Sequence, residues 1–278
     1  MKAVIIAKGS GTTFSEDGAL IPKIMVKIGE KPMLWHIMKS YSCYGINDFI
    51  ICCGYKSNVI REYFANYHLN NSDVTFRLRD NTMELHSNLT EPWNVTLVNT
   101  SQDSTTGGQL KKIKNHIGDQ TFCMTYGNAL SDVNIRDLIS FHRSAGLMAT
   151  LIAVQHTGRS GMFHLKEQET KVNSMREKLN GSELLWTNGG YFVLEPEILD
   201  YIEDEENVWE KETLEGLSGE GQLSAYRHTG FWKPMDTLND KNVLEKLWQS
   251  GTAPWHEHVI KNQYQNLSPS ANLKALKN

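Results

Sequence analysis

The sequence predicts an α/β protein with a largely parallel sheet. Short apolar runs alternate with segments of helical spacing through the first 155 residues, and several of these runs are fully apolar, as buried strands are. This alternation is typical of parallel strands that are joined by helices. The chain has 278 residues, of which 40% are hydrophobic and 22% charged, so it can bury a full core and is not expected to be disordered.

Each element follows from a local pattern. Apolar runs predict strands at residues 3–6, 49–53, 75–78, 95–98, 122–125 and 149–154. Apolar residues three or four positions apart predict helices at 32–44, 56–67, around 110–117 and at 133–144, with Pro32 in a first turn. After residue 155 the pattern loosens, with strand-like stretches at 184–186 and 191–194, helix-like stretches at 198–203 and 209–217, and a late helix around 243–248.

Composition and charge exclude several classes of partner. Lys and Arg number 28 against 32 Asp and Glu, a net charge of −4, so neither nucleic acid nor an anionic membrane is expected as the main partner. The apolar runs are too short to span a membrane, and the N-terminal run is too short for a signal peptide. The four cysteines show no C-x-x-C spacing and are expected to be reduced and mostly buried. We therefore expect a cytoplasmic protein.

Two loops are long enough to predict a function. Residues 79–93 form one of them, and residues 10–21 follow the first strand directly. Ligands of open α/β sheets bind at the carboxyl ends of strands, where glycines let backbone N–H groups approach phosphate. By itself, the segment Gly9, Ser10, Gly11 and Thr12 favours a structural turn over a phosphate site, because it lacks the third glycine of G-x-G-x-x-G and no G-K-[ST] follows.

Longer stretches give that loop a context. They include MKAVIIAKGSGTT at residues 1–13, PKIMV at 22–26, FIICCGYK at 49–56, EPWNVTLV at 91–98, NGGYFVL at 188–194 and GFWKPMDTL at 230–238. Together they resemble sugar-phosphate nucleotidyltransferases, and glucose-1-phosphate cytidylyltransferases in particular, in register from residue 1 to about 255. The resemblance implies a Rossmann-like mixed, mostly parallel sheet flanked by helices, with a smaller β-rich C-terminal part.

The family's organisation and chemistry are expected to follow. Residues 1–155 would form the nucleotide-binding core, residues 156–255 a sugar-phosphate-binding and oligomer part continuous with it, and residues 256–278 a C-terminal extension. The reaction would join a nucleoside triphosphate, CTP being favoured, to a sugar 1-phosphate and release pyrophosphate. Mg²⁺ would lie between carboxylates and phosphates, and the chain would form a homo-oligomer.

The resemblance also assigns site residues. Lys23 would contact the nucleotide phosphates, although a surface lysine beside a turn is the alternative. The other expected contacts to the nucleotide are Gly9, Ser10, Gly11, Thr12, Thr106, Gly107, Gly108 and Gly127. Those to the sugar phosphate are Arg159, Glu177, Lys178, Asn188 and Gly189. The metal ligands would be Asn128 and Asp236, and a helix N-cap is the alternative for Asp236.

Three positions depart from the family pattern. Lys8, Thr13 and Asn128 stand where relatives have Gly, Arg and Asp. An Asn oxygen brings no charge to Mg²⁺, and Thr13 cannot replace a planar guanidinium, so weak metal binding and reduced activity are expected. Lys8 could supply part of the missing charge or obstruct the phosphates. Asp132 is another metal-ligand candidate, with helix capping as the favoured role.

Two classes of function therefore stay open. The first is an enzyme that makes CDP-glucose or a related nucleotide sugar, or that transfers to another phosphorylated acceptor. The second is a catalytically silent or repurposed paralogue that still binds nucleotide or sugar phosphate. The histidines predict no site, and His256 and His258 are more typical of a surface role than of metal binding.

Overall fold

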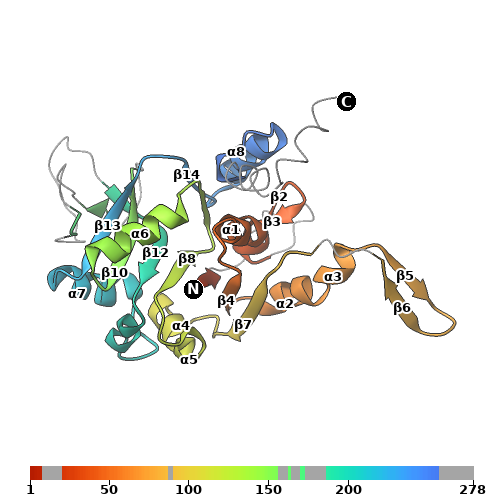
Figure 1. Cartoon of the computed structure of the whole chain (residues 1–278), viewed down its shortest axis with the longest axis horizontal. Coiled ribbons are helices and arrows are strands. Elements are labelled where there is room, and N and C mark those ends of the chain that lie inside the picture. The colour runs from red at the N-terminus through yellow and green to blue at the C-terminus, as the bar shows by residue number, and fades with distance from the viewer. Residues whose placement is uncertain (8–20, 87–89, 156–161, 164–169, 173–185, 257–278) are drawn as a thin grey trace, which may run out of the picture.

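A computed structural model of the chain describes residues 1–7, 21–86, 90–155, 162–163, 170–172 and 186–256 (Figure 1). Its main sheet runs in the order β13 (Leu223–His228), β10 (Ala149–Val154), β12 (Trp186–Leu194), β8 (Phe122–Tyr126), β1 (Lys2–Ala7), β4 (Asp48–Cys53) and β7 (Asn94–Asn99), with β11 (Met162–Phe163) beside β12. Within the described sheet β12 runs antiparallel to its neighbours β8, β10 and β11, and the other neighbouring pairs are parallel. The expected mixed, mostly parallel sheet is confirmed.

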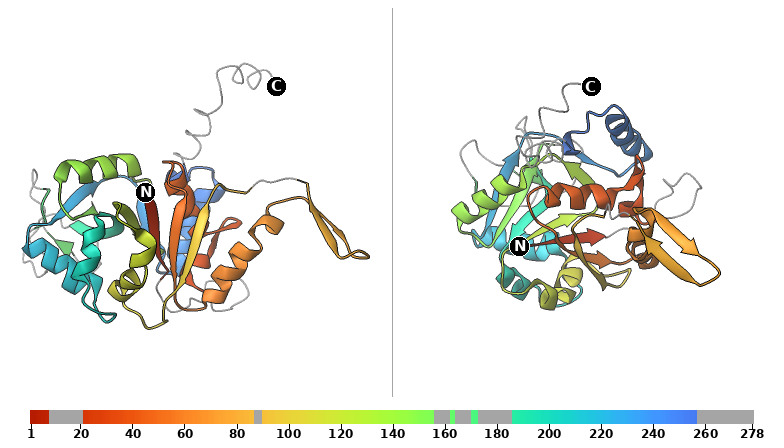
Figure 2. Two further views of the ribbon diagram at one scale, coloured as in Figure 1. Left: turned by 60° about the horizontal axis from the view of Figure 1, so that its bottom comes forward. Right: turned by 45° about the vertical axis from the view of Figure 1, so that its right-hand side comes forward.

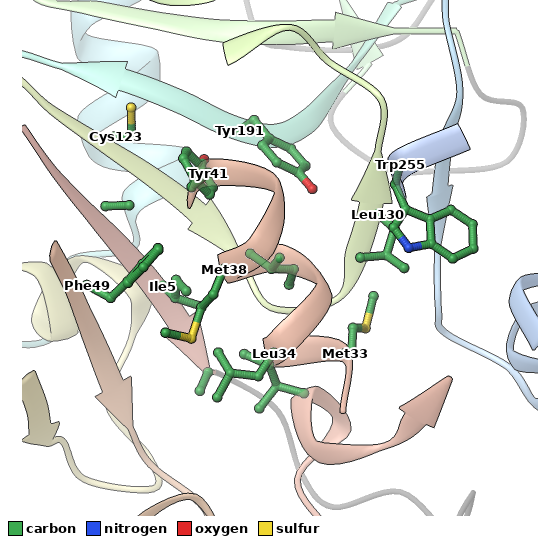
Figure 3. Close-up of a cluster of buried hydrophobic side chains, with 14 of the residues drawn as sticks. Ile5, Met33, Leu34, Met38, Tyr41, Phe49, Cys123, Leu130, Tyr191 and Trp255 are labelled. Atoms are coloured by element: carbon green, nitrogen blue, oxygen red, sulfur yellow. The ribbon is translucent and has the colours of Figure 1, made fainter. Parts of the chain in front are cut away.

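Strand periodicity divides the core between the two faces of the sheet. In β1, Ala3, Ile5 and Ala7 face one cluster of buried side chains, and Val4 and Ile6 face another. Figure 3 shows part of the first cluster, where Ile5 and Phe49 of the sheet meet side chains of α1 (Met33–Ser42). Pro32 is the N-cap residue of α1, one position before the first turn in which it was expected.

The remaining helices flank this sheet. They are α2 (Ser57–Ala65), α3 (Tyr67–Asn70), α4 (Thr106–Lys112), α5 (Lys114–Ile117), α6 (Ile135–Ala145), α7 (Leu214–Gly219) and α8 (Leu238–Gln249). Short 3₁₀ turns cover Lys23–Met25 and Pro196–Tyr201, and a π-helical turn covers Trp209–Thr213. No helix among the described residues is both long and apolar enough to cross a membrane.

Several predicted elements need correction. Residues 198–203 were expected to be helical, but a 3₁₀ turn stands there, and the helix expected at 209–217 begins as a π-helical turn. The loop expected at 79–93 contains β6 (Thr82–Leu85), which pairs with β5 (Val74–Arg77) in a hairpin that projects from the body (Figure 2). All four residues of β6 are exposed, so no buried apolar run marks this strand. The signal that could have predicted it is the alternation of polar and apolar residues over Thr82, Met83, Glu84 and Leu85.

Two small pairs of strands complete the described fold. β2 (Lys27–Ile28) pairs with β3 (Lys31–Pro32), and β9 (Ala129–Ser131) pairs with β14 (Trp232–Pro234). The β9–β14 pair is antiparallel, with Ala129 opposite Pro234. It therefore brings the segment after β8 beside the segment that leads into α8, although the two are about a hundred residues apart in sequence.

Candidate active site

The carboxyl ends of the parallel strands meet at one edge of the sheet. β8 leaves the sheet there through Gly127 and Asn128. β12 is antiparallel to β8, with Tyr191 opposite Thr125, so its beginning lies on the same edge as the end of β8. Asn188 and Gly189 belong to that beginning. The structure thus places expected nucleotide, metal and sugar-phosphate residues at a single edge, where ligands of such sheets bind.

The central feature of this edge is an ion pair between Lys23 and Asp236. The ammonium nitrogen Nζ of Lys23 lies 3.1 Å from Oδ1 of Asp236, and the two side chains are 23% and 42% exposed. Asn128 is adjacent, because its carbonyl oxygen accepts a 2.8 Å hydrogen bond from the N–H of Met235. Three segments that are far apart in the sequence therefore meet at one cation and one carboxylate.

Gly127 allows this approach. Its N–H donates to the carbonyl of Ile6 at 3.1 Å, which extends the pairing of β8 with β1. A Cβ at residue 127 would lie only 2.4 Å from Cδ1 of Ile24, in the 3₁₀ turn that carries Lys23. Any larger residue would force the side chain of Ile24 to shift, so close packing against that side chain favours glycine at this position.

The turn that begins β12 is joined to the same group of segments. The indole Nε1 of Trp232 donates to the carbonyl of Gly189 at 2.8 Å, and Oδ1 of Asn188 accepts from the N–H of Gly190 at 2.8 Å. Gly190 has a φ of +75°, a conformation that favours glycine. Trp232 lies in β14, four residues before Asp236, so one short strand fixes both the metal candidate and the sugar-phosphate candidate.

Asp236 is not a helix cap. The N-cap of α8 is Thr237, whose hydroxyl accepts from the N–H of Asp240 while Oδ2 of Asp240 accepts from the N–H of Thr237. Lys233 also contacts Asp240 at 2.6 Å. Partial burial opposes the ionisation of Asp240, but hydrogen bonds from Lys233 and Thr237 outweigh it and lower its pKa to about 2. The capping alternative for Asp236 is therefore wrong, and its carboxylate is available to Lys23.

Sequence reasoning missed the supporting role of Lys233 and Asp240. The signal that could have found it is the Thr237-x-x-Asp240 spacing of a capping box directly after Asp236. Sequence reasoning also favoured Asp132 as a helix cap. Instead, Asn134 caps α6 by accepting from two backbone N–H groups, and Oδ1 of Asp132 lies 3.0 Å from Nε2 of His228.

Thr106, Gly107 and Gly108 lie at the start of α4, with Thr105 as the N-cap. A Cβ at Gly107 would lie 2.4 Å from the carbonyl oxygen of Asn207, and one at Gly108 would lie 2.1 Å from that of Glu205. The structure therefore gives these glycines a close backbone contact with residues 205–207. Contact with a nucleotide base stays a prediction for this segment.

Other expected residues cannot be placed. Those outside the described residues are Lys8, Gly9, Ser10, Gly11, Thr12, Thr13, Arg159, Glu177 and Lys178. His258 is also outside them. The ring of His256 lies 5.0 Å from that of Trp248 and 6.3 Å from that of Trp35, which is an aromatic packing environment.

The donors at the Lys23–Asp236 pair suit a cation that arrives with oxygen ligands of its own. Asp236 supplies a carboxylate, and the ammonium group of Lys23 is the positive charge that this carboxylate binds in the structure. Asn128, which has an amide oxygen in its side chain, lies on the segment that is hydrogen-bonded to Met235. Within the described ranges no three His, Cys, Asp or Glu side chains form a group that could hold a metal. A divalent cation here would need phosphate or water oxygens to complete its coordination.

Comparison with known proteins shows the family of the chain. The family model for nucleotidyl transferases matches residues 2–237. The chain is 51% identical over 256 residues to glucose-1-phosphate cytidylyltransferase of Salmonella typhi, covering 92% of this chain and 98% of the relative. It is 39% identical to a probable glucose-1-phosphate cytidylyltransferase of Bacillus subtilis, covering 92% and 99%.

Solved structures support the fold alone. HddC of Yersinia pseudotuberculosis superposes with a TM-score of 0.69 at 20% identity, over 89% of this chain and 99% of that one. A UDP-glucose pyrophosphorylase complexed with UDP-glucose gives a TM-score of 0.68 at 16% identity, over 90% and 98%. With a family model that matches residues 2–237 and relatives that match 92% of the chain at 39% and 51% identity, the chain belongs to the nucleotidyl transferase family.

Proposed function

We propose that this protein transfers a cytidylyl group from CTP to glucose 1-phosphate, giving CDP-glucose and pyrophosphate. The observation that carries the proposal is the Lys23–Asp236 ion pair beside Asn128 at the carboxyl edge of the sheet. It joins the expected phosphate-binding lysine to the expected metal ligand. The 51% identity to a cytidylyltransferase over nearly the whole chain supports the choice of base and sugar.

The residues would act through charge and position. In the reaction, an oxygen of glucose 1-phosphate attacks the α-phosphorus of CTP, the bond from that phosphorus to the β-phosphate oxygen breaks, and pyrophosphate leaves. Lys23 would leave Asp236 and bind the triphosphate, where its charge offsets the charge that develops on the leaving group. Asn188 and Gly189 would orient the sugar phosphate from the facing side of the same edge.

Asp236 and Asn128 would hold Mg²⁺. When bound, the ion supplies positive charge that draws electron density from the phosphate oxygens. Because Asn128 brings no charge, we propose that this site binds the ion weakly and that the enzyme is slower than relatives with two carboxylates. Asn128, Thr13 and Lys8 also favour the second candidate function, a silent or repurposed paralogue that binds nucleotide or sugar phosphate without turnover.

Pyrophosphate release separates the two candidates. The full-length protein would be assayed with Mg²⁺, with each of the four ribonucleoside triphosphates, and with glucose 1-phosphate or another sugar 1-phosphate. We expect release above background with CTP and glucose 1-phosphate. Binding of CTP with no release from any pair would contradict the enzyme and leave the silent paralogue. Release only with another base would change the proposed substrate.

We also propose a homo-oligomer in which the β5–β6 hairpin contacts a second copy of the chain. The hairpin projects from the body (Figure 2). Its large apolar side chains are exposed, with Phe76 55% exposed and Leu78 88% exposed. Apolar surface of this kind on an arm that leaves the body is typical of subunit contacts. A cytoplasmic location is proposed with it, since Cys43, Cys52, Cys53 and Cys123 are all free thiols.

A further inference from the structure

Two adjoining hollows lie at the opposite, amino-terminal edge of the sheet. One has a volume of about 280 Å³ and is lined by side chains that include Arg136, Ser140 and Arg143 of α6. The other, of about 400 Å³, is lined by residues that include Thr121, Glu195 and Glu197. Both contain Met1 and Arg143, so they share a wall. We call the pair the amino-edge pocket. Its size is that of a small-molecule site.

The first hollow of the amino-edge pocket is basic. Arg136 and Arg143 are seven residues apart on α6, with Ser140 between them, so all three lie on one helix face. The ion pairs found among the described residues do not include either guanidinium. Two guanidinium groups two turns apart can bind one phosphate group between them, because each offers a planar fork of N–H donors.

The second hollow offers hydrogen-bond acceptors that are held in place. Glu195 lies 35% exposed in the wall, and Oε1 of its carboxylate is 3.0 Å from Nε2 of His142, which is 1% exposed. Oε2 accepts from the hydroxyl of Thr121 at 2.9 Å. Each carboxylate oxygen keeps a further lone pair for a ligand hydroxyl. A binding site needs a carboxylate group with a fixed orientation, and the buried His142 provides this for Glu195.

The tautomer of His142 follows from these contacts. Burial lowers the pKa of His142, which keeps the imidazole neutral. Because a carboxylate only accepts, Nε2 carries the proton and donates to Glu195, and Nδ1 accepts from the hydroxyl of Thr150 at 2.8 Å. His142 and Thr121 therefore hold the carboxylate group of Glu195 in one orientation in the wall of the second hollow.

We infer that the amino-edge pocket is a second binding site, which takes a phosphorylated sugar with its phosphate between Arg136 and Arg143 and its hydroxyl groups donating to Glu195 and Glu197. The site is distinct from the candidate active site, because the two lie at opposite ends of the same strands. β8 begins directly after Thr121 and ends directly before Gly127, and Glu195 follows the last residue of β12, the strand that begins near Asn188. A ligand in the pocket thus contacts the strands that position the active site.

Binding stoichiometry tests this inference on the full-length protein. Radiolabelled glucose 1-phosphate would be titrated by equilibrium dialysis against the native chain, the double variant Arg136→Gln with Arg143→Gln, and the control Arg61→Gln, which changes an exposed arginine on α2. We expect two molar equivalents to bind the native chain and the control, and one to bind the double variant. Loss of charged donors should weaken the second site roughly 10- to 100-fold.

The counts also separate this inference from the proposed function. If the carboxyl-edge site does not bind glucose 1-phosphate, the native chain binds one equivalent and the double variant none, which still supports the amino-edge pocket. Equal counts for the native chain and the double variant would overturn the inference. Hydrogen exchange gives a second measurement: ligand should protect residues 119–121 and 136–143, and protection confined to 126–128 and 186–190 would overturn it.

Discussion

Replacement of Lys23 by methionine separates its chemical role from its contribution to stability. The side chain keeps its length and loses its charge. The pair with Asp236 is partly exposed to water, and pairs of this kind contribute roughly 0–1 kcal/mol to folding. Loss of one preorganised charge at a phosphoryl-transfer site costs about 10²- to 10³-fold in rate, or about 3–4 kcal/mol. Lys23→Met should therefore damage activity far more than stability.

The assay compares kcat/KM for pyrophosphate formation, CTP affinity by tryptophan fluorescence, and the urea midpoint. Lys114→Met is the matched control, because Lys114 pairs with Asp200 on an exposed surface beside the amino end of β8. We expect the control to resemble the native chain in all three measurements. A Lys23→Met variant with kcat/KM and CTP affinity within about fivefold of native would refute the assignment of Lys23 to the phosphates, whatever happened to stability.

Three further outcomes are expected. The double variant Asn128→Asp with Thr13→Arg should raise pyrophosphate release, since it returns two missing charges; no gain in a folded variant that binds CTP would place the limit elsewhere. Phe76→Asp with Leu78→Asp should lower the mass measured by light scattering, and a native chain that is already monomeric would contradict the hairpin contact. Burial lowers the pKa of His36 to about 4, so the unfolded chain binds more protons than the folded chain between pH 6.5 and 4. The free energy of unfolding should therefore fall by on the order of 3 kcal/mol as the pH drops through that window. Urea unfolding of the native and His36→Gln proteins at several pH values checks this.

The strands of the sheet could be predicted because burial leaves a pattern in the sequence. The prediction of strands at residues 3–6 and 49–53 is confirmed, since both are buried on two faces and read as continuous apolar runs. The hairpin strand β6 was missed, because it is exposed and its only sequence signal is a four-residue alternation of polar and apolar residues. The small β9–β14 pair depends on a contact between segments a hundred residues apart, which local patterns do not encode.

The sequence could predict which residues belong to the candidate site, but not which of them are in contact. Resemblance supplied Lys23, Asn128 and Asp236 as residues, and their roles toward phosphate and metal stay predictions. The structure adds that the N–H of Met235 donates to the carbonyl oxygen of Asn128, which joins the two segments. The direct ion pair between Lys23 and Asp236 was not predicted, because it needs the 3₁₀ turn to pack on Gly127 and β14 to pair with β9. Those are tertiary contacts with no local signal in the sequence.

The charge balance at this pair yields the last prediction. The positive charge of Lys23 offsets the negative charge of Asp236, and Asn128 adds no charge. The site therefore has no net negative charge that would attract a free divalent cation. A triphosphate would change this, since it gives Lys23 a new partner and brings oxygen ligands of its own. Mn²⁺, used as a spectroscopic probe by electron paramagnetic resonance, should therefore bind at least about tenfold more tightly with CTP present than without it. Asn128→Asp should raise Mn²⁺ affinity without CTP by about tenfold, because it adds a carboxylate beside the first, whereas Asn115→Asp, which adds the same charge on exposed α5, should not. Equal affinities with and without CTP in the native chain would mean that Lys23 does not compete with the metal for Asp236.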